Sequence, residues 1–352
     1  MPDRIQAKEA LDSIIRKARV HLYKPIQIAE ILYHARLNPD SINLANLEDY
    51  RNQSKKWRDA ICIELVGRPC TSSAKFQDNL FEDNAIPPVI LEALGEENLR
   101  TDGAVESYIY RQFTSRYLQM ANALDYALEA TPENFDVKGF IDSFRYEAGL
   151  RRSIDKIYEI VVYALFSTLV NALDLQIEIS IDIGKRDILA EFADFASMVM
   201  CLDIHSLTRS QAARVYRVGV TNAADRGLDM YSNWGPAIQI KHLSLNEELA
   251  EGIVNSVTSD KIVIVCKDAD EHLIISLLNQ LGWRSRIQSV VTESNLEQWY
   301  IKALRGTYAE DLGEELLTCL CEEIVNEFPS VEKMPSILRE RRYENISDEF
   351  WV

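Results

Sequence analysis

The residues best suited to chemistry lie in one short stretch, residues 227–243, with the sequence GLDMYSNWGPAIQIKHL. Asp229 precedes a short strand-like run, an Asn-Trp-Gly-Pro turn follows, and the next run carries Gln239 and Lys241. Side chains two positions apart on a strand share a face, and a hairpin brings its two runs together. The spacing therefore predicts that a carboxylate, an amide oxygen and an ammonium group converge. Such a set can hold a hard divalent cation against a phosphate, while the lysine orients the attacking water or stabilises developing charge.

This arrangement resembles the active-site hairpin of the PD-(D/E)xK nucleases, in which an Asp is followed after about ten residues by an acidic residue or glutamine, one further residue and a lysine. Leu228 stands where the proline of that motif would be, and Gln239 replaces the more usual Glu or Asp. One negative charge fewer should weaken magnesium binding, and it leaves the number of metal ions open. The resemblance implies that Asp229, Gln239 and Lys241 are catalytic. Asp229, Gln239 and the Ile240 carbonyl would bind Mg²⁺, and Lys241 would orient the attacking water.

A wider resemblance connects the chain to the HaeII-type restriction endonucleases. It is carried by residues 17–30 (KARVHLYKPIQIAE), 71–81 (TSSAKFQDNLF), 222–229 (NAADRGLD) and 235–242 (GPAIQIKH). The resemblance implies a type II endonuclease that recognises the palindrome RGCGCY in double-stranded DNA and cuts both strands with magnesium. Because a palindrome is most simply recognised by a two-fold symmetric protein, we expect a homodimer with one hairpin for each DNA strand.

Other interpretations of the residues around the hairpin stay open. Asp229 also fits a role in capping its turn, beside a Gln-x-Lys pair that faces solvent. Asp225 is either a further ligand or, as we favour, a loop aspartate that binds its own backbone. For His242 we favour a core histidine with a satisfied hydrogen bond over a general base. Either Glu159 or Glu191 could supply an additional carboxylate from a preceding helix, and the sequence does not choose between them.

The net charge of −17 argues against DNA binding, but the charge is unevenly distributed. Seven acidic residues and no lysine or arginine lie between Ala309 and Glu327, whereas the stretch from Arg51 to Lys75 has a local charge of +4. A local basic face is therefore compatible with an acidic protein. The expected DNA-contacting side chains are Arg51, Lys55, Lys56, Arg58, Lys75, Gln77 and Asn79. A solvated helix face explains the same charges about as well.

The spacing of apolar residues predicts a helical first half and a mixed second half. Amphipathic helices are expected at residues 10–20, 26–37, 57–66 and 107–130, and a buried helix at 153–172. Strands are then expected at 175–181, 262–265 and 287–291, and helices at 246–257, 271–281 and 296–305. The pattern indicates an α/β (α+β) protein whose helical N-terminal half precedes a restriction-endonuclease-like mixed-sheet core flanked by helices. We expect residues 1–150 to form a helical region with DNA recognition and dimer contacts. Residues 151–352 would form the PD-(D/E)xK-like nuclease core with an acidic C-terminal helix.

Cysteine usage and hydropathy bear on the compartment. Six cysteines are scattered without a Cys-x-x-Cys pair, which predicts reduced thiols and no zinc site: Cys62, Cys70, Cys201, Cys266, Cys319 and Cys321. The first residues lack the apolar core of a signal peptide, and no run approaches the roughly 18 uncharged apolar residues that span a bilayer. We expect a cytoplasmic protein without a membrane segment.

Two other functions fit parts of this sequence. A non-catalytic helical interaction protein, whose acidic C-terminal helix docks a basic partner, would explain the net charge more simply. A structure-specific repair nuclease would keep the same active site but would cut junctions or damaged DNA without a fixed recognition sequence.

Overall fold

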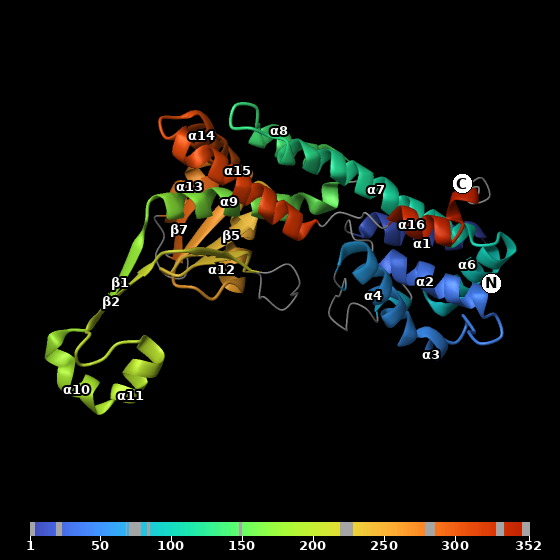
Figure 1. The fold of residues 1–352 in the computed structure, drawn as a ribbon, viewed down its shortest axis with the longest axis horizontal. Coiled ribbons are helices and arrows are strands. Elements are labelled where there is room, and N and C mark those ends of the chain that lie inside the picture. Colours follow the sequence, from blue (N-terminus) through green and yellow to red (C-terminus); the bar gives the residue numbers. More distant parts are fainter. Residues whose placement is uncertain are drawn as a thin grey trace.

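The computed structural model describes residues 4–18, 23–67, 69, 79–82, 85–147, 150–218, 228–278, 286–328 and 334–346. Helices form one end of an elongated molecule, and a sheet with its own helices forms the other (Figure 1). A thin arm projects from the sheet end, away from the rest of the chain. The α+β architecture expected from the sequence is confirmed.

The helical end, which we call the helical lobe, is built from helices of the first half of the chain. These are α1 (Arg4–Lys17), α2 (Tyr23–Leu37), α3 (Leu47–Tyr50), α4 (Gln53–Val66), the one-turn helix η1 (Asn79–Phe81) and α6 (Pro88–Arg100). Their apolar faces share one buried cluster, to which Leu11, Ile28 and Leu91 contribute. The helices expected at residues 10–20, 26–37 and 57–66 are confirmed as α1, α2 and α4.

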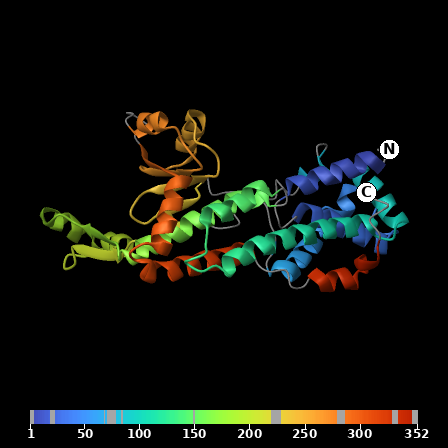
Figure 2. The ribbon, with the colours of Figure 1, turned by 90° about the horizontal axis from the view of Figure 1, so that it is seen from above.

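A single long helix, α7 (Ala104–Leu128), joins the helical lobe to the sheet end. Its first half places Ile109 and Phe113 in the cluster of the helical lobe, and its second half places Met120 and Leu124 in the cluster beside the sheet. At 1.5 Å per residue a helix of 25 residues spans roughly 37 Å. Figure 2 shows it running from the helical lobe toward the sheet end. The two ends thus share a continuous helix.

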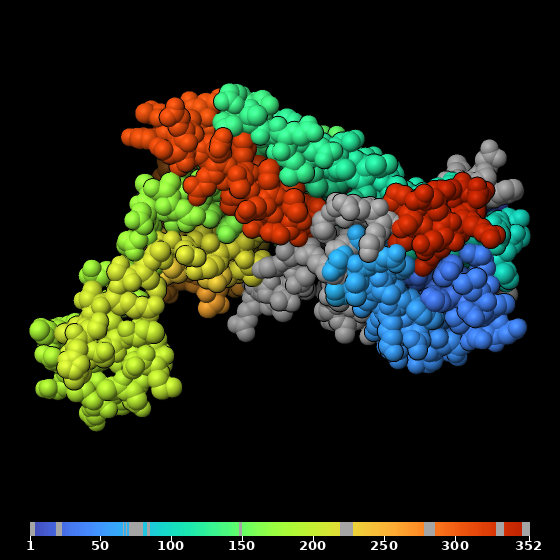
Figure 3. Space-filling model, in the orientation of Figure 1, coloured from blue at the N-terminus to red at the C-terminus, as the bar shows by residue number. Residues whose placement is uncertain are grey.

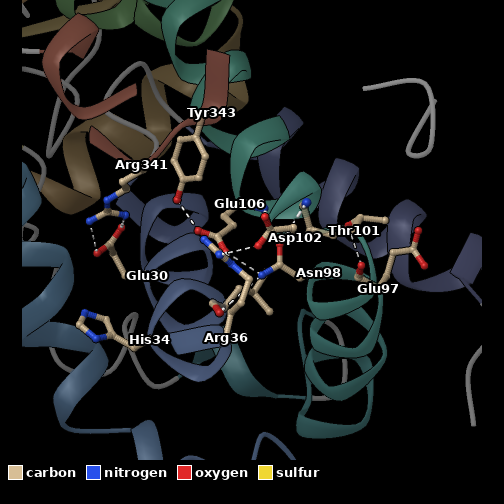
Figure 4. A network of polar contacts seen from close by, with 12 residues as sticks. Glu30, His34, Arg36, Glu97, Asn98, Thr101, Asp102, Glu106, Arg341 and Tyr343 are labelled. Carbon is tan, nitrogen blue, oxygen red and sulfur yellow. Dashed lines mark hydrogen bonds and ion pairs between the residues drawn. The ribbon is translucent and has the colours of Figure 1, made fainter. Parts of the chain in front are cut away.

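The end of the chain returns to the helical lobe as α16 (Met334–Glu340) and the one-turn helix η6 (Tyr343–Asn345). Arg341 donates hydrogen bonds to both carboxylate oxygens of Glu30 in α2, at 2.5 and 3.0 Å. Tyr343 donates to the fully buried Glu106 of α7 (Figure 4). The last described residues, 334–346, therefore pack with helices from the first half of the chain.

Five short strands form the central sheet, in the order β3–β4–β5–β6–β7. They are β3 (Val215–Arg217), β4 (Met230–Ser232), β5 (Ala237–Lys241), β6 (Ile262–Cys266) and β7 (Ile287–Thr292). Neighbours from β3 to β5 are antiparallel, and neighbours from β5 to β7 are parallel. The mixed sheet and the strands expected at residues 262–265 and 287–291 are confirmed.

Helices cover both faces of this sheet. One face carries α9 (Ile154–Ala172), α14 (Glu293–Arg305) and α15 (Ala309–Glu327), and α8 (Val137–Tyr146) packs with them after α7; the other carries α12 (Glu247–Ser256) and α13 (Glu271–Leu278). Successive residues of β5 point to opposite faces, as a strand requires. Ile238 and Ile240 join the cluster beneath α9, whereas Ala237 joins the cluster beneath α12. Gln239 and Lys241 share the face of Ala237.

The acidic helix α15 packs its apolar side against α9 through residues such as Leu316 and Leu320. At its C-terminal end, Arg217 of β3 pairs with Glu323 at 2.8 Å and with Glu327 at 3.1 Å. Part of the negative charge of this helix is therefore neutralised within the protein.

The projecting arm lies between α9 and β3 in sequence. It consists of an antiparallel ribbon of β1 (Gln176–Ser180) and β2 (Thr208–Ala212), and its tip carries η3 (Ile183–Lys185), α10 (Arg186–Glu191), α11 (Ala193–Phe195) and the π-helical turn η4 (Ala196–Met200). The strand expected at residues 175–181 is thus present as β1. It pairs with β2 in a separate sheet and not with the central one, because its alternating pattern fixes a strand but not its neighbour.

Neither disulfides nor membrane helices are found in the described part of the chain. The cysteines described there are all free thiols: Cys62, Cys201, Cys266, Cys319 and Cys321. Within the same residues, no helix is both long and apolar enough to cross a membrane.

Candidate active site

The hairpin expected at the centre of the site is formed by β4 and β5. Met230 pairs with Ile238, and continuing this antiparallel register by one residue sets Asp229 opposite Gln239. The turn between the strands is closed by the amide of Ser232, which donates to the carbonyl of Pro236 at 3.0 Å. Gly235 in that turn has a φ of +127°, a conformation that glycine adopts without strain.

Asp229 is the point at which the three expected groups meet. Its Oδ2 atom accepts a hydrogen bond from the backbone amide of Ile240 at 2.7 Å and another from the side-chain amide of Gln239. The ammonium group of Lys241 lies 3.7 Å from the same oxygen. The convergence predicted from spacing is therefore observed, and the interpretation of Gln239 and Lys241 as a solvent-facing pair does not fit, since Gln239 is only 1% exposed.

The carboxylate of Asp229 is largely buried, with 17% of its side chain exposed. Burial raises the pKa of Asp229 above its ordinary value, and the positive charge of Lys241 opposes part of that rise. A negative charge held in such a place is stabilised by any further positive charge that binds beside it.

A second carboxylate approaches the site from α9. Glu159 is 7% exposed and pairs with Lys156 at 2.7 Å. Burial raises the pKa of Glu159 to about 7; Lys156 opposes the rise, and the charge of Asp229 adds to it. The electrostatic coupling to Asp229 sets Glu159 beside the site, whereas Glu191 is exposed on the arm. Of the two acids that the sequence left open, the structure favours Glu159.

One buried oxygen of the site has no hydrogen-bond partner among the described residues, namely Oε1 of Gln239. Unpaired buried oxygens are rare, and one on a side chain that is bonded to a largely buried carboxylate suits a bound cation. The carbonyl of Ile240 lies on the same side, because the amide and carbonyl of one strand residue face the same neighbour and its amide binds Asp229. Carboxylate, amide and carbonyl oxygens are the donors that Mg²⁺ and Ca²⁺ prefer. The residues present therefore fit a hard divalent cation.

Beside these groups opens a hollow of about 450 Å³, bounded by β5 and α12. Gln239 and Lys241 line it, as does Glu248 in the first turn of α12. Glu248 was not singled out from the sequence, although an acidic first turn directly after a catalytic hairpin is a detectable signal. In the described residues no three His, Cys, Asp or Glu side chains gather as a metal site. Position 239 carries an amide in place of a carboxylate, so the hairpin supplies one acid fewer to such a group.

Of the two further candidates from the sequence, His242 and Asp225, only His242 lies within the described residues. His242 is hydrogen-bonded, with its Nδ1 atom 2.6 Å from Oδ1 of Asp155 in α9. Its side chain is 26% exposed, so it lies at the surface next to the site and not in the core. Asp225 lies outside the described residues.

The expected DNA-contacting set needs one correction, which concerns Arg58. This side chain is only 1% exposed, and its guanidinium group donates to Asp59 at 2.6 Å and to Gln27 at 3.2 Å. Arg58 lies on the buried side of α4, because the helical periodicity of three to four residues places it on the same side as Ser54, Ile61 and Cys62. Arg58 therefore stabilises the helical lobe and is not available to a phosphate.

The other members of the set lie on or near α4. Lys56 is exposed, and Arg51 and Lys55 are partly exposed. Lys75 and Gln77 lie outside the described residues, and Asn79 begins η1. Figure 3 shows a concave side of the molecule between the arm and the helical lobe, and α12 lies on this side of the core in Figure 1.

Comparison with known proteins places the whole chain in one family. The sequence model described as HaeII restriction endonuclease matches residues 7–343. The chain is 56% identical to the type II restriction enzyme HaeII of Haemophilus aegyptius over 344 residues, 97% of each chain. It is also 56% identical to the type II restriction enzyme NgoBI of Neisseria gonorrhoeae over 335 residues, 95% of this chain and 94% of the relative. No solved structure matches it.

This membership overturns the interpretation of the chain as a non-catalytic interaction protein, and the apolar side of its acidic helix is already covered by α9. The chain belongs to the HaeII restriction endonuclease family and is a site-specific deoxyribonuclease.

Proposed function

We propose that the protein recognises the palindrome RGCGCY in double-stranded DNA and hydrolyses one phosphodiester bond in each strand, as a homodimer that depends on Mg²⁺. The palindrome is the one implied by the family resemblance, and relatives 56% identical over almost the whole chain support it. The two-fold symmetry of such a site supports one hairpin for each strand.

The proposed site combines the hairpin with α9. Asp229, Gln239 and the Ile240 carbonyl would bind Mg²⁺, and Glu159 would complete the site as the second carboxylate. Bound Mg²⁺ supplies Lewis acidity, which favours ionisation of the attacking water and stabilises charge on the departing oxygen.

Lys241 has the central role among the chain's own groups. Its ammonium group lies beside Asp229 and lines the open hollow, so it can donate hydrogen bonds both to the attacking water and to a phosphate oxygen. Attack of the water on phosphorus, in line with the bond to the 3′ oxygen, would break that bond and leave a 5′ phosphate and a 3′ hydroxyl.

DNA binding is assigned to the helical lobe and the segment that follows α4. Lys56, Arg51 and Lys55 would bind phosphates, which position the DNA without selecting a sequence. Bases would be recognised from the major groove by side chains such as Lys75, Gln77 and Asn79, and arginine contacts to guanine would suit a G·C-rich site.

The observation that carries the proposal is the meeting of Asp229, Gln239 and Lys241 around a buried amide oxygen that has no partner in the described residues. A hairpin that served only as structure would not need a largely buried carboxylate beside a half-exposed ammonium group that lines an open hollow. The pair suits a phosphate and a cation together.

The test is cleavage of one plasmid of known sequence by the purified protein, with Mg²⁺ and with excess chelator. We expect discrete fragments only with Mg²⁺, and sequencing of their ends should place every cut within RGCGCY. Lys241→Ala should lower the cleavage rate by roughly 100-fold or more, since it removes a transition-state contact, while a gel-shift assay shows DNA binding retained. The matched control is Lys302→Ala, which removes an exposed lysine of α14.

Each part of the proposal has its own contrary outcome. Cleavage in chelator would exclude the metal. Full activity of Lys241→Ala would exclude the proposed site. Fragment ends scattered over the plasmid, or cuts found only at junctions, would exclude recognition of the palindrome.

A further inference from the structure

The arm exposes an unusual amount of apolar surface. Six side chains at its tip are each more than half exposed: Ile183, Ile188, Phe192, Phe195, Met198 and Val199. None of the described residues of the arm belongs to the three hydrophobic clusters of the protein. A two-stranded ribbon is marginally stable by itself, and monomers rarely expose apolar patches of this kind. The arm therefore has the character of a surface that is covered by something else.

The exposed side chains form a stripe and are not scattered. Four of the six, Ile188, Phe192, Phe195 and Val199, follow at intervals of four, three and four residues, about one helical turn each, along the successive short helices α10, α11 and η4. The helical tip buries its other side through Leu189 and Ala196. The helical tip therefore carries apolar side chains on two sides, and the exposed ones have no partner in the described residues.

The charge of the arm disfavours a DNA backbone as that partner. Residues 174–213 contain seven acidic and three basic residues, a net charge of −4. Asp187, Glu191 and Asp194 are exposed on the helical tip beside the apolar stripe. DNA phosphates would be repelled by this surface. The chemistry fits an apolar groove with a basic border.

Such a groove is present on the nuclease core. A hollow of about 330 Å³ is lined by apolar side chains, among them Leu169, Val170, Trp234 and Trp299. It shares Trp234 with a larger polar hollow, on whose border Lys261 is exposed. Arg286 also lines that polar hollow. The groove is thus apolar with cations at one end, which complements an apolar stripe flanked by acids.

The groove lies at the base of the arm. Leu169 and Val170 belong to the last turn of α9, directly before the ribbon begins. At the other strand of the ribbon, Asn233 of the hairpin turn donates to the carbonyl of Ala212 at 3.0 Å and accepts from the amide of Arg214 at 2.8 Å. Because the arm projects away from the body, its tip does not reach this groove in its own chain (Figure 1).

We propose that the partner of the arm is a second copy of this chain, with the stripe of each arm seated in the groove of the other copy. Exchange of this kind is isologous and closes at two copies. Several hundred Å² of apolar surface on each arm, used twice, reaches the scale of a stable interface of roughly 1,600 Å² in total. The inference rests on the proposed homodimer and names the surface that forms it.

The contact also relates the dimer to the active sites. The base of the arm is hydrogen-bonded to the turn of the hairpin whose other end carries Asp229 and Gln239. Docking two arms therefore fixes the spacing of two hairpins through short, bonded connections, as cutting both strands of one palindrome requires.

The first experiment measures molecular mass by sedimentation equilibrium of the whole protein without DNA. We expect wild type to be a dimer. Phe192→Ser combined with Phe195→Ser should weaken dimerisation by at least about 30-fold, as loss of central aromatic anchors does. The matched control, Leu99→Ser combined with Leu118→Ser, changes similarly exposed apolar side chains in α6 and α7 and should leave the dimer intact. Far-ultraviolet circular dichroism and thermal unfolding verify the fold of each variant.

The second experiment separates arm from groove by mixing variants. Val170→Asp alters the groove, and Lys261→Glu alters its exposed basic border without touching the core. Each should weaken dimerisation alone. An equimolar mixture of the arm variant with a groove variant should recover heterodimers, because one arm and one groove in that pair are intact.

The outcomes that overturn the inference are distinct from failure of the proposed function. Dimers that persist in the arm variant, or in both groove variants, would show that another surface joins the copies while the homodimer itself stands. Loss of DNA binding by a still dimeric arm variant would assign the arm to DNA. Wild type that is monomeric with and without DNA would exclude both the homodimer and the arm contact, while metal-dependent cleavage would still test the site.

Discussion

Gln239 is where this site differs most from a metal site made of acids alone. Its amide nitrogen donates to Asp229, and its buried oxygen has no partner among the described residues. A neutral amide keeps the metal-free hairpin stable, because it adds no further negative charge beside Asp229 and Glu159. The same neutrality lowers the attraction for a cation.

Gln239→Glu should reverse both effects: it should destabilise the metal-free protein and strengthen metal binding. Without metal, the variant loses the hydrogen bond to Asp229 and places a third acid in a buried position, so its free energy of unfolding should fall by about 1–3 kcal/mol. With Mg²⁺, the additional charge should tighten metal binding by at least about 10-fold, since a unit charge at 4 Å is worth several kcal/mol in a partly buried place.

Thermal unfolding with and without Mg²⁺ measures both effects. The control Gln119→Glu adds the same charge at an exposed position of α7 and should change neither. An unchanged response of Gln239→Glu to Mg²⁺ would remove Gln239 from the metal site.

Glu159 should make the stability of the metal-free protein depend on pH. Its pKa is about 7 in the folded protein, against an ordinary value of 4.5 that applies when the chain is unfolded. Between these values the folded state binds more protons, so the free energy of unfolding falls as pH rises through this window. At pH 8, Glu159→Gln should therefore be more stable than wild type, by up to about 3 kcal/mol.

Urea unfolding in chelator at several pH values checks this, with the exposed Glu314→Gln as control. A difference between wild type and Glu159→Gln that stays constant from pH 5 to pH 8 would contradict the raised pKa. Mg²⁺ should stabilise wild type at pH 8 more than it stabilises the variant, because only wild type keeps the second carboxylate.

At the scale of elements, one hairpin has two different ends. Its open end, at Asp229 and Lys241, carries the candidate chemistry. Its turn carries Asn233, which is hydrogen-bonded to Ala212 and Arg214 where the arm returns to the core, and Trp234, which lines the groove proposed for a second copy. The two short strands thus connect the base of the arm to Asp229 and Gln239, the proposed metal ligands.

The acidic helix α15 shows how a charged element is used inside a structure. Its apolar side packs on α9, and Arg217 pairs with Glu323 and Glu327 near its C-terminal end. Negative charge here supports packing between β3 and α15. The overall charge of −17 is therefore compatible with a basic patch elsewhere.

At the scale of the whole molecule, the two ends of the chain are held together in the helical lobe. Arg341 and Glu30 form a largely buried ion pair there, with Glu30 1% exposed, and the hydroxyl of Tyr110 also donates to Glu30 at 2.5 Å (Figure 4). This contact connects a segment that follows the nuclease core to a helix near the start of the chain.

Replacing one member of that pair should lower the free energy of unfolding more than replacing both members. Arg341→Met leaves the buried Glu30 without its cation and should lower the free energy of unfolding by about 3–5 kcal/mol. Adding Glu30→Met should restore part of the loss, although the Tyr110 hydroxyl then lacks its acceptor. The pair of Arg100 and Glu97 provides the control, since Arg100 is exposed and Arg100→Met should change the free energy of unfolding far less than Arg341→Met does.

Urea unfolding of the two single variants and the double variant gives the coupling energy. A double variant that is less stable than Arg341→Met would mean that the two residues act independently. Proteolysis within residues 334–346 should accelerate in Arg341→Met if the pair holds this segment in place.

The sequence alone determined the local parts of this protein. The 3.6-residue and two-residue periodicities fixed helices such as α2, α4 and α9 and strands such as β6, because each pattern depends on neighbours within a few positions. The hairpin was equally local, since Asp229 and Gln239 are ten residues apart and joined by a turn with its own chemistry. The family resemblance rested on whole blocks of residues and was confirmed by the match over residues 7–343.

Only the tertiary structure decided what lies far apart along the chain. Glu159, and not Glu191, lies near Asp229, and Arg58 is buried. Strand β1 does not belong to the central sheet, and residues 334–346 pack against the first helices. The physical reason is that periodicity specifies which face of an element is apolar, but not which other apolar face covers it. An acid, an arginine or a strand acquires its role from that choice, and packing makes the choice across more than a hundred residues of sequence.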